Sequence, residues 1–148
     1  MPISLIILAA GMGSRMNSDL PKVLHGLGGA PLLVHAMRAG AVLEPQRVVV
    51  VTGHGADLVE KAALADNPDA ICVHQSEQNG TAHAVQQARD ALAGVGGDAV
   101  VLYGDTPFVQ SDTIAGMIQA RAQHDVIVLG FEAADPGRYG RLVMDGDS

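Results

Sequence analysis

Aromatic residues are scarce in this sequence. Its 148 residues include two tyrosines, two phenylalanines and no tryptophan, whereas glycine occurs 18 times. A core built from such a composition must be mainly aliphatic, and the glycines indicate many tight turns. The composition therefore favours alternating strands and helices over an aromatic-rich β-sandwich.

Cysteine is almost absent as well, since Cys72 is the only one. A single cysteine excludes an internal disulfide, and it makes a reducing cytoplasm the simplest setting for the protein. The neighbours of Cys72 are apolar, so we interpret this side chain as a small buried hydrophobe.

Basic residues are few: nine lysines and arginines stand against sixteen acidic residues, which gives a formal charge of −7. This balance argues against a nucleic-acid backbone or an anionic membrane as the main partner. Phosphate ligands remain compatible with it, because one arginine and one lysine placed locally can outweigh a global excess of acid.

Long hydrophobic runs are also missing. The first apolar run meets Gly11 far short of the roughly 20 residues that a membrane span needs, and no basic residue precedes it as in a signal peptide. We therefore expect a cytoplasmic protein that has no membrane partner.

The sequence does contain short runs rich in isoleucine and valine, with helical patterns between them. The runs are nearly all apolar, as in strands that are covered on both faces. Their order predicts an α/β fold with a doubly wound, mostly parallel, Rossmann-like sheet in a single domain. The expected strands are 4–8, 47–52, 70–74, 99–102 and 126–131, and the expected helices are 31–43, 56–64, 81–92 and 112–123.

Residues 138–147 resemble the start of a β-hairpin, with Asp145 and Gly146 as its turn. No returning strand follows within the 148 residues. We therefore expect the nucleotide-binding part of one domain, incomplete at its C-terminus.

The first strand leads into a loop of small residues, Leu8-Ala9-Ala10-Gly11-Met12-Gly13-Ser14-Arg15. Such a loop lets the backbone approach a ligand, and its N–H groups can hold phosphate oxygens. Arg15 and Lys22 add two cations. A glycine-x-glycine turn can also be purely structural, but two familiar alternatives fit poorly. The Gly-Lys-Ser/Thr of a P-loop is missing, and Met16 stands where a dinucleotide fold needs its third glycine.

The whole segment resembles the signature of sugar-phosphate nucleotidyltransferases: LAAGMGSRM, followed by Pro21-Lys22. Later segments resemble the N-terminal uridylyltransferase domain of the bacterial bifunctional UDP-N-acetylglucosamine pyrophosphorylases / glucosamine-1-phosphate N-acetyltransferases. These segments are GHG at 53–55, QSEQNGTAHA at 75–84, YGDTP at 103–107 and YGR at 139–141. The matches span nearly the whole chain, from Leu8 to Arg141.

The resemblance implies which residues bind the substrates. Arg15, Lys22 and Asp105 would be the catalytic groups, and Asp105 would hold Mg²⁺, which prefers hard oxygen ligands. His83 is interpreted as packing or hydrogen-bonding support. The residues expected to bind nucleotide or sugar are Leu8, Ala9, Ala10, Gly11, Gly13, Lys22, Gln75, Gly80, Thr81, Tyr103, Gly104, Asp105 and Gly140.

Within that set, the side-chain amide of Gln75 suits the imide edge of uracil, because it presents both a donor and an acceptor. Gly80 would give room for the base, and Thr81 would add a hydroxyl that caps the next helix. Gln78 fits a ligand contact and an exposed loop residue equally well.

The reaction implied by the resemblance is attack of N-acetylglucosamine 1-phosphate on UTP, which forms UDP-N-acetylglucosamine and pyrophosphate for peptidoglycan and cell-wall synthesis. The family's acetyltransferase β-helix, on which its trimer depends, would be absent from these residues. Two alternatives stay open: a nucleotidyltransferase that uses GTP or CTP, and a fragment that binds UTP without turnover. A dinucleotide oxidoreductase is the least favoured reading.

Overall fold

The computed structural model describes residues 1–11 and 18–146. The chain divides into two compact units, Met1–Ile114 and Ala115–Ser148. The first unit contains the sheet and, apart from Gly140, the predicted site residues that the structure describes.

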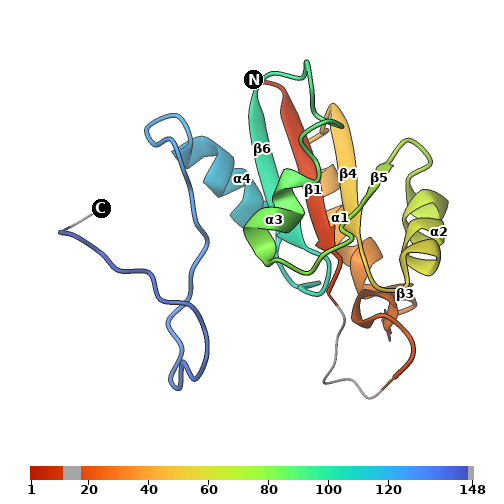
Figure 1. The fold of residues 1–148 in the computed structure, drawn as a ribbon. Coiled ribbons are helices and arrows are strands. Elements are labelled where there is room, and N and C mark those ends of the chain that lie inside the picture. Colours follow the sequence, from red (N-terminus) through yellow and green to blue (C-terminus); the bar gives the residue numbers. More distant parts are fainter. Residues whose placement is uncertain (12–17, 147–148) are drawn as a thin grey trace. The chain divides into compact units, whose positions relative to one another are not determined.

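A four-stranded parallel sheet in the order β5-β4-β1-β6 forms the centre of the first unit (Figure 1). Its strands are β1 (Ile3–Ala9), β4 (Arg47–Thr52), β5 (Ile71–His74) and β6 (Asp98–Tyr103). These correspond to four of the five predicted strands. The apolar β1 pairs with β4 on one side and with β6 on the other, so both of its faces and both of its edges are covered.

Helices cover both faces of this sheet. On one face, Leu5 and Ile7 of β1 pack in a cluster with residues of α1 (Leu32–Ala41), α2 (Ala56–Asp66) and the first turn of α4 (Ser111–Ala120). On the other face, Ile6 and Leu8 pack with Ala84 of α3 (Thr81–Gln86) and with Ala88. The predicted doubly wound α/β fold is therefore confirmed.

Short elements join β1 to α1. They are the 3-10 helix η1 (Lys22–Leu24) and the two-residue strands β2 (Gly26–Leu27) and β3 (Ala30–Pro31), which pair antiparallel. Gly28 and Gly29 turn this small hairpin with φ angles of +57° and +89°. None of the helices in the described part of the chain is long and apolar enough to span a membrane.

The predicted helix over 81–92 is too long. α3 ends at Gln86, and turns follow up to residue 94. Beyond Gln86 the backbone N–H groups of Ala88 and Arg89 bond carbonyls three residues earlier, at Val85 and Gln86. Leu92 still bonds the Ala88 carbonyl four residues earlier, but most of the α-helical i→i+4 pattern is replaced by tighter turns.

Two predictions for the second unit are wrong. Residues 126–131 form no strand, and residues 138–146 form no hairpin arm. A strand needs a hydrogen-bonded neighbour, and neither segment is paired in the described chain. Val126, Val128 and Phe131 are accordingly exposed, and Phe131 packs edge-to-face on Tyr139 with 5.3 Å between ring centroids.

Candidate functional site

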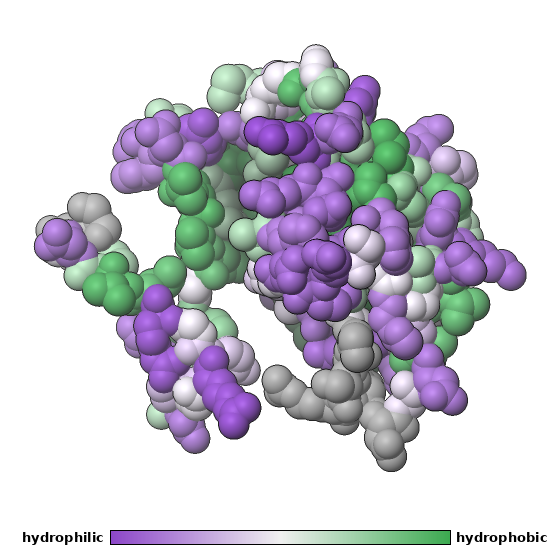
Figure 2. Space-filling model, in the orientation of Figure 1, coloured by the Kyte–Doolittle hydropathy of each residue, from purple (hydrophilic) through white to green (hydrophobic). Residues whose placement is uncertain are grey.

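The carboxyl ends of the parallel strands bring the described site residues of the first unit to one edge of the sheet. Past the strand ends, the N–H of Gly104 donates to the Leu8 carbonyl at 2.9 Å, and the N–H of Gln75 donates to the Thr52 carbonyl at 2.8 Å. Ligands of doubly wound sheets bind at this edge. Figure 2 shows the side of the molecule over the 75–80 loop and α3 as mostly hydrophilic.

Ala10, in the first loop, is held by two neighbours. Gln78 Nε2 donates to the Ala10 carbonyl at 2.8 Å. Gly53, just after β4, approaches so closely that a Cβ on it would lie 2.6 Å from the same oxygen. The sequence fitted Gln78 equally well to a ligand contact and to an exposed loop residue. In the structure this side chain links the 75–80 loop to the first loop. The residue is exposed, but its amide nitrogen is held at this contact.

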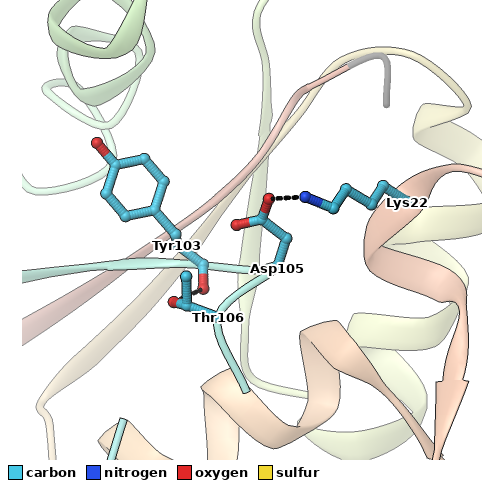
Figure 3. A network of polar contacts seen from close by, with 4 residues as sticks. All are labelled: Lys22, Tyr103, Asp105 and Thr106. Atoms are coloured by element: carbon cyan, nitrogen blue, oxygen red, sulfur yellow. Dashed lines mark hydrogen bonds and ion pairs between the residues drawn. The ribbon is translucent and has the colours of Figure 1, made fainter. Parts of the chain in front are cut away.

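Lys22 and Asp105 form an ion pair at this edge. The Lys22 ammonium donates to Asp105 Oδ2 at 2.7 Å, although the two residues are 83 positions apart. Figure 3 shows the two side chains pointing toward each other, whereas the Tyr103 ring points away from the pair. Lys22 comes from η1, and Asp105 follows the end of β6.

This ion pair is open to solvent, since the side chains of Lys22 and Asp105 are 41% and 33% exposed. Exposed pairs contribute only about 0–1 kcal/mol to stability, so both groups can exchange partners at little cost. The ammonium can turn to a phosphate and the carboxylate to a cation. This chemistry is what the charge of a nucleoside triphosphate requires.

The position of Lys22 depends on a close contact behind it. Pro21, the residue before η1, is fully buried. It packs on Gly55 so tightly that a Cβ on Gly55 would lie 2.4 Å from Pro21 Cγ. Gly55 also has a left-handed backbone, with φ +66°, as the N-cap of α2. The GHG segment, which follows β4, thus supports the lysine through its contact with Pro21.

Asp105 also fits a magnesium ligand. Mg²⁺ is commonly held by one or two carboxylates together with substrate phosphates, not by a full protein cage. The described residues contain no group of three or more His, Cys, Asp or Glu side chains that could hold a metal by themselves. A metal at Asp105 would therefore take its other ligands from phosphate oxygens and water.

Gln75 lies deeper than the sequence suggested. It is 3% exposed, and its Nε2 lies 3.3 Å from the Gly80 carbonyl and 2.9 Å from His83 Nδ1. His83 also lies within hydrogen-bond distance of Gln87. The prediction that His83 gives hydrogen-bonding support is confirmed.

Thr81 does not cap α3, which corrects the sequence prediction. The N-cap is Gly80, and no side chain caps the helix; Thr81 is already the first helical residue. The backbone of Gly80 has φ +92° and ψ −179°, a region that is open almost only to glycine. This conformation directs the Gly80 carbonyl to the N–H of Ala84 as well as to Gln75.

The other predicted residues divide by location. Gly13 and Arg15 lie outside the described residues. Gly11 and Tyr103 are exposed at the strand ends, whereas Leu8, Ala9, Ala10 and Gly104 are buried backbone positions there. Gly140 belongs to the second unit and is exposed.

Cys72 is only half-buried on β5. Burial, with a smaller contribution from the Glu60 carboxylate, raises the pKa of its thiol. The thiol therefore stays protonated at neutral pH and is a poor nucleophile.

Comparison with known proteins shows which family the chain belongs to. Residues 5–141 match the family of MobA-like NTP transferase domains. The chain belongs to that family. It therefore carries an NTP transferase domain, and its described ion pair and loops lie within the matched residues.

Individual relatives of this NTP transferase are more similar to it than a family match alone would require. It is 66% identical over its whole length to the bifunctional protein GlmU of Dinoroseobacter shibae and to that of Ruegeria pomeroyi. In each case the chain spans 33% of the relative's length.

Solved structures agree with the fold. HddC from Yersinia pseudotuberculosis, complexed with GMP-PN, is 26% identical with a TM-score of 0.76, covering 97% of this chain and 65% of the other. A nucleotidyl transferase from Methanothermobacter thermautotroptrophicus is 29% identical with a TM-score of 0.66, covering 80% and 57%.

Proposed function

We propose that this chain is the nucleotide-binding part of a uridylyltransferase that joins UTP and N-acetylglucosamine 1-phosphate into UDP-N-acetylglucosamine and pyrophosphate. The observation that carries the proposal is the exposed Lys22–Asp105 pair at the carboxyl edge of the sheet, beside the first loop. The 66% identity to GlmU proteins supports the choice of substrates.

In this proposal the sugar phosphate is itself the nucleophile, because it is an anion at neutral pH. Its oxygen forms a bond to the α-phosphorus of UTP, while the bond from that phosphorus to the pyrophosphate leaving group breaks. The protein then needs only to align the reactants and neutralise charge. Lys22, with Arg15, would stabilise the departing pyrophosphate.

Asp105 would hold Mg²⁺, which supplies positive charge to the phosphate oxygens when bound. The first loop, from Leu8 to Gly13, would receive the nucleotide with its backbone, and Gln75, Gly80 and Thr81 would receive the base. Tyr103, Gly104 and Gly140 would complete the contacts with nucleotide and sugar. We also propose that residues 1–148 are one part of a single nucleotidyltransferase domain, acting in the cytoplasm in cell-wall precursor synthesis.

The direct test is a calorimetric titration of this chain with UTP, with and without Mg²⁺, against ATP, GTP and CTP. We expect selective, Mg²⁺-strengthened binding of UTP. Preference for GTP would favour the second candidate, a guanylyltransferase, which the GMP-PN complex of HddC brings into consideration. UTP binding without pyrophosphate release would indicate a binding fragment. A folded chain that binds no nucleotide would contradict the proposal.

The contact between Gln78 and Ala10 gives a further prediction. Gln78→Leu keeps the side-chain size but removes the N–H donor from the Ala10 carbonyl, at a cost of about 1 kcal/mol. We expect UTP to bind about fivefold more weakly, because the first loop loses its attachment to the 75–80 loop. Gln86→Leu on the exposed side of α3 is the matched control. Equal affinities for the two variants would show that the attachment does not shape the site.

A further inference from the structure

The side-chain amide of Gln75 is oriented by two partners. Its Nε2 lies 3.3 Å from the Gly80 carbonyl oxygen and 2.9 Å from His83 Nδ1. A carbonyl oxygen can only accept a hydrogen bond, so the group that faces Gly80 must be the NH₂. This end of the amide therefore faces the first turn of α3, between the Gly80 carbonyl and the His83 ring.

The carbonyl oxygen of the same amide takes no part in these two contacts. It accepts no hydrogen bond from the described residues. In that part of the chain, the one side-chain nitrogen or oxygen that is both sealed from solvent and unpartnered is Nε2 of His25. The Gln75 oxygen therefore keeps access to solvent at the edge of the sheet, although the residue as a whole is 3% exposed.

His83 decides whether this orientation is held. A neutral imidazole accepts at one nitrogen only. The contact from Gln75 Nε2 to Nδ1 is 2.9 Å, against 3.2 Å between Gln87 Nε2 and His83 Nε2. Gln87 Nε2 also donates to the His83 carbonyl at 3.0 Å, so it does not depend on the ring for a partner, and we take Nδ1 as the accepting nitrogen. The Gly80 carbonyl also accepts the N–H of Ala84, so its 3.3 Å bond to Gln75 is the weaker of the two restraints on the amide.

We propose that His83 is a positioning residue that sets the base specificity of the site, by fixing the Gln75 amide with its oxygen toward the nucleotide. This inference rests on the proposed UTP site and concerns how that site chooses its base. An oxygen held there can only accept, so it suits a base edge whose ring nitrogen carries a proton, as in uracil. Cytosine presents a lone pair at that ring nitrogen, and the two acceptors would face each other unpaired.

A site built to pair a polar edge discriminates strongly, because the wrong base leaves buried polar groups without partners. If His83 no longer held the NH₂ group, the amide could turn about its last torsion and present a donor to cytosine instead. Loss of His83 should therefore change the choice between bases more than it changes binding of the triphosphate.

The test is the ratio of the CTP to the UTP dissociation constant, measured by calorimetry on this chain with Mg²⁺. We expect His83→Leu to lower this ratio about tenfold, mainly because CTP gains affinity. His83→Asn places an acceptor close to the position of Nδ1 and should restore the wild-type ratio. Gln87→Leu removes the other partner of His83 and should leave the ratio unchanged.

Circular dichroism of each variant checks that the fold is kept, and His83→Asn provides the comparison should the leucine variant unfold. Wild-type preference for UTP with an unchanged ratio in His83→Leu would overturn the positioning role and leave the uridylyltransferase proposal standing. A loss of UTP and CTP affinity in equal measure would also overturn it, since that is what a purely structural role predicts. A wild-type chain that binds neither nucleotide would contradict both the proposed UTP site and the positioning role of His83.

Discussion

Asp105→Asn should reduce nucleotidyl transfer about a hundredfold or more while the protein stays folded. The carboxylate lies just after β6, where it forms its 2.7 Å pair with Lys22, and asparagine has the same shape without the charge. Removing one group that stabilises developing charge typically costs a factor of 10²–10³ in turnover. We would measure pyrophosphate release in a chimaera in which residues 1–148 replace the matching N-terminal third of the Ruegeria pomeroyi relative.

Two further variants sharpen this experiment. Lys22→Ala should lower turnover to a similar degree, because the phosphates lose their counter-charge. Asp112→Asn neutralises an exposed carboxylate in the first turn of α4 and should leave turnover unchanged. Full activity of Asp105→Asn would remove this carboxylate from the mechanism, and full activity of Lys22→Ala would do the same for the ammonium.

Lys22→Ala also separates the binding of a divalent cation at Asp105 from the binding of UTP. Without the ammonium, the carboxylate loses its resident counter-ion, so a divalent cation should bind the chain more tightly even as UTP binds more weakly. Titration with Mn²⁺ alone, followed by electron paramagnetic resonance, would detect this. Weaker Mn²⁺ binding in Lys22→Ala than in the wild type would contradict a metal site at Asp105.

The second large effect is on stability: Gly55→Ala should lower the free energy of unfolding by about 2–4 kcal/mol. A left-handed conformation costs alanine about 1–2 kcal/mol, and Gly55 has φ +66°. The new methyl would also lie 2.4 Å from Cγ of the fully buried Pro21, which forces a backbone shift. Because Pro21 precedes Lys22, UTP affinity should fall as well. Urea unfolding followed by circular dichroism gives the free energy.

Gly116→Ala is the matched control for this substitution. Gly116 lies within α4, and a Cβ there meets nothing within 4 Å. Alanine in a helix interior should stabilise the chain by about 0.5–1 kcal/mol. Opposite signs for the two glycine substitutions are therefore expected. A Gly55→Ala variant as stable as the wild type would show that Pro21 yields easily, and that the GHG segment does not support Lys22.

The strands of the first unit and the layers of helices on both faces of its sheet could be predicted from the sequence, because the apolar runs are local signals. Residues 47–52 are continuous valines with polar ends, and both the predicted and the observed strand begin and end there. Boundaries were less accurate where the signal depends on hydrogen bonding, as in α3, whose pattern continues beyond its last α-helical residue, Gln86. The strand over 126–131 failed for a related reason: sequence shows that a segment is apolar, but not whether a neighbour is present to pair with it.

By itself, the sequence determined the α/β class, because apolar runs and helical patterns alternate along the chain. From residue type and spacing it also predicted that the first loop binds phosphate, with Arg15 and Lys22 near it. Only the tertiary structure decided which of these residues meet. In the folded chain Lys22 pairs with Asp105, and Gln78 donates to the Ala10 carbonyl. The Gln75 amide faces His83, and Pro21 packs on Gly55. Each of these contacts joins residues that are apart in the sequence. Whether they meet depends on the order of the strands in the sheet or on the turn at the start of α3. The direction of a side chain at such a junction depends on its packing and hydrogen-bond partners, which no local pattern encodes.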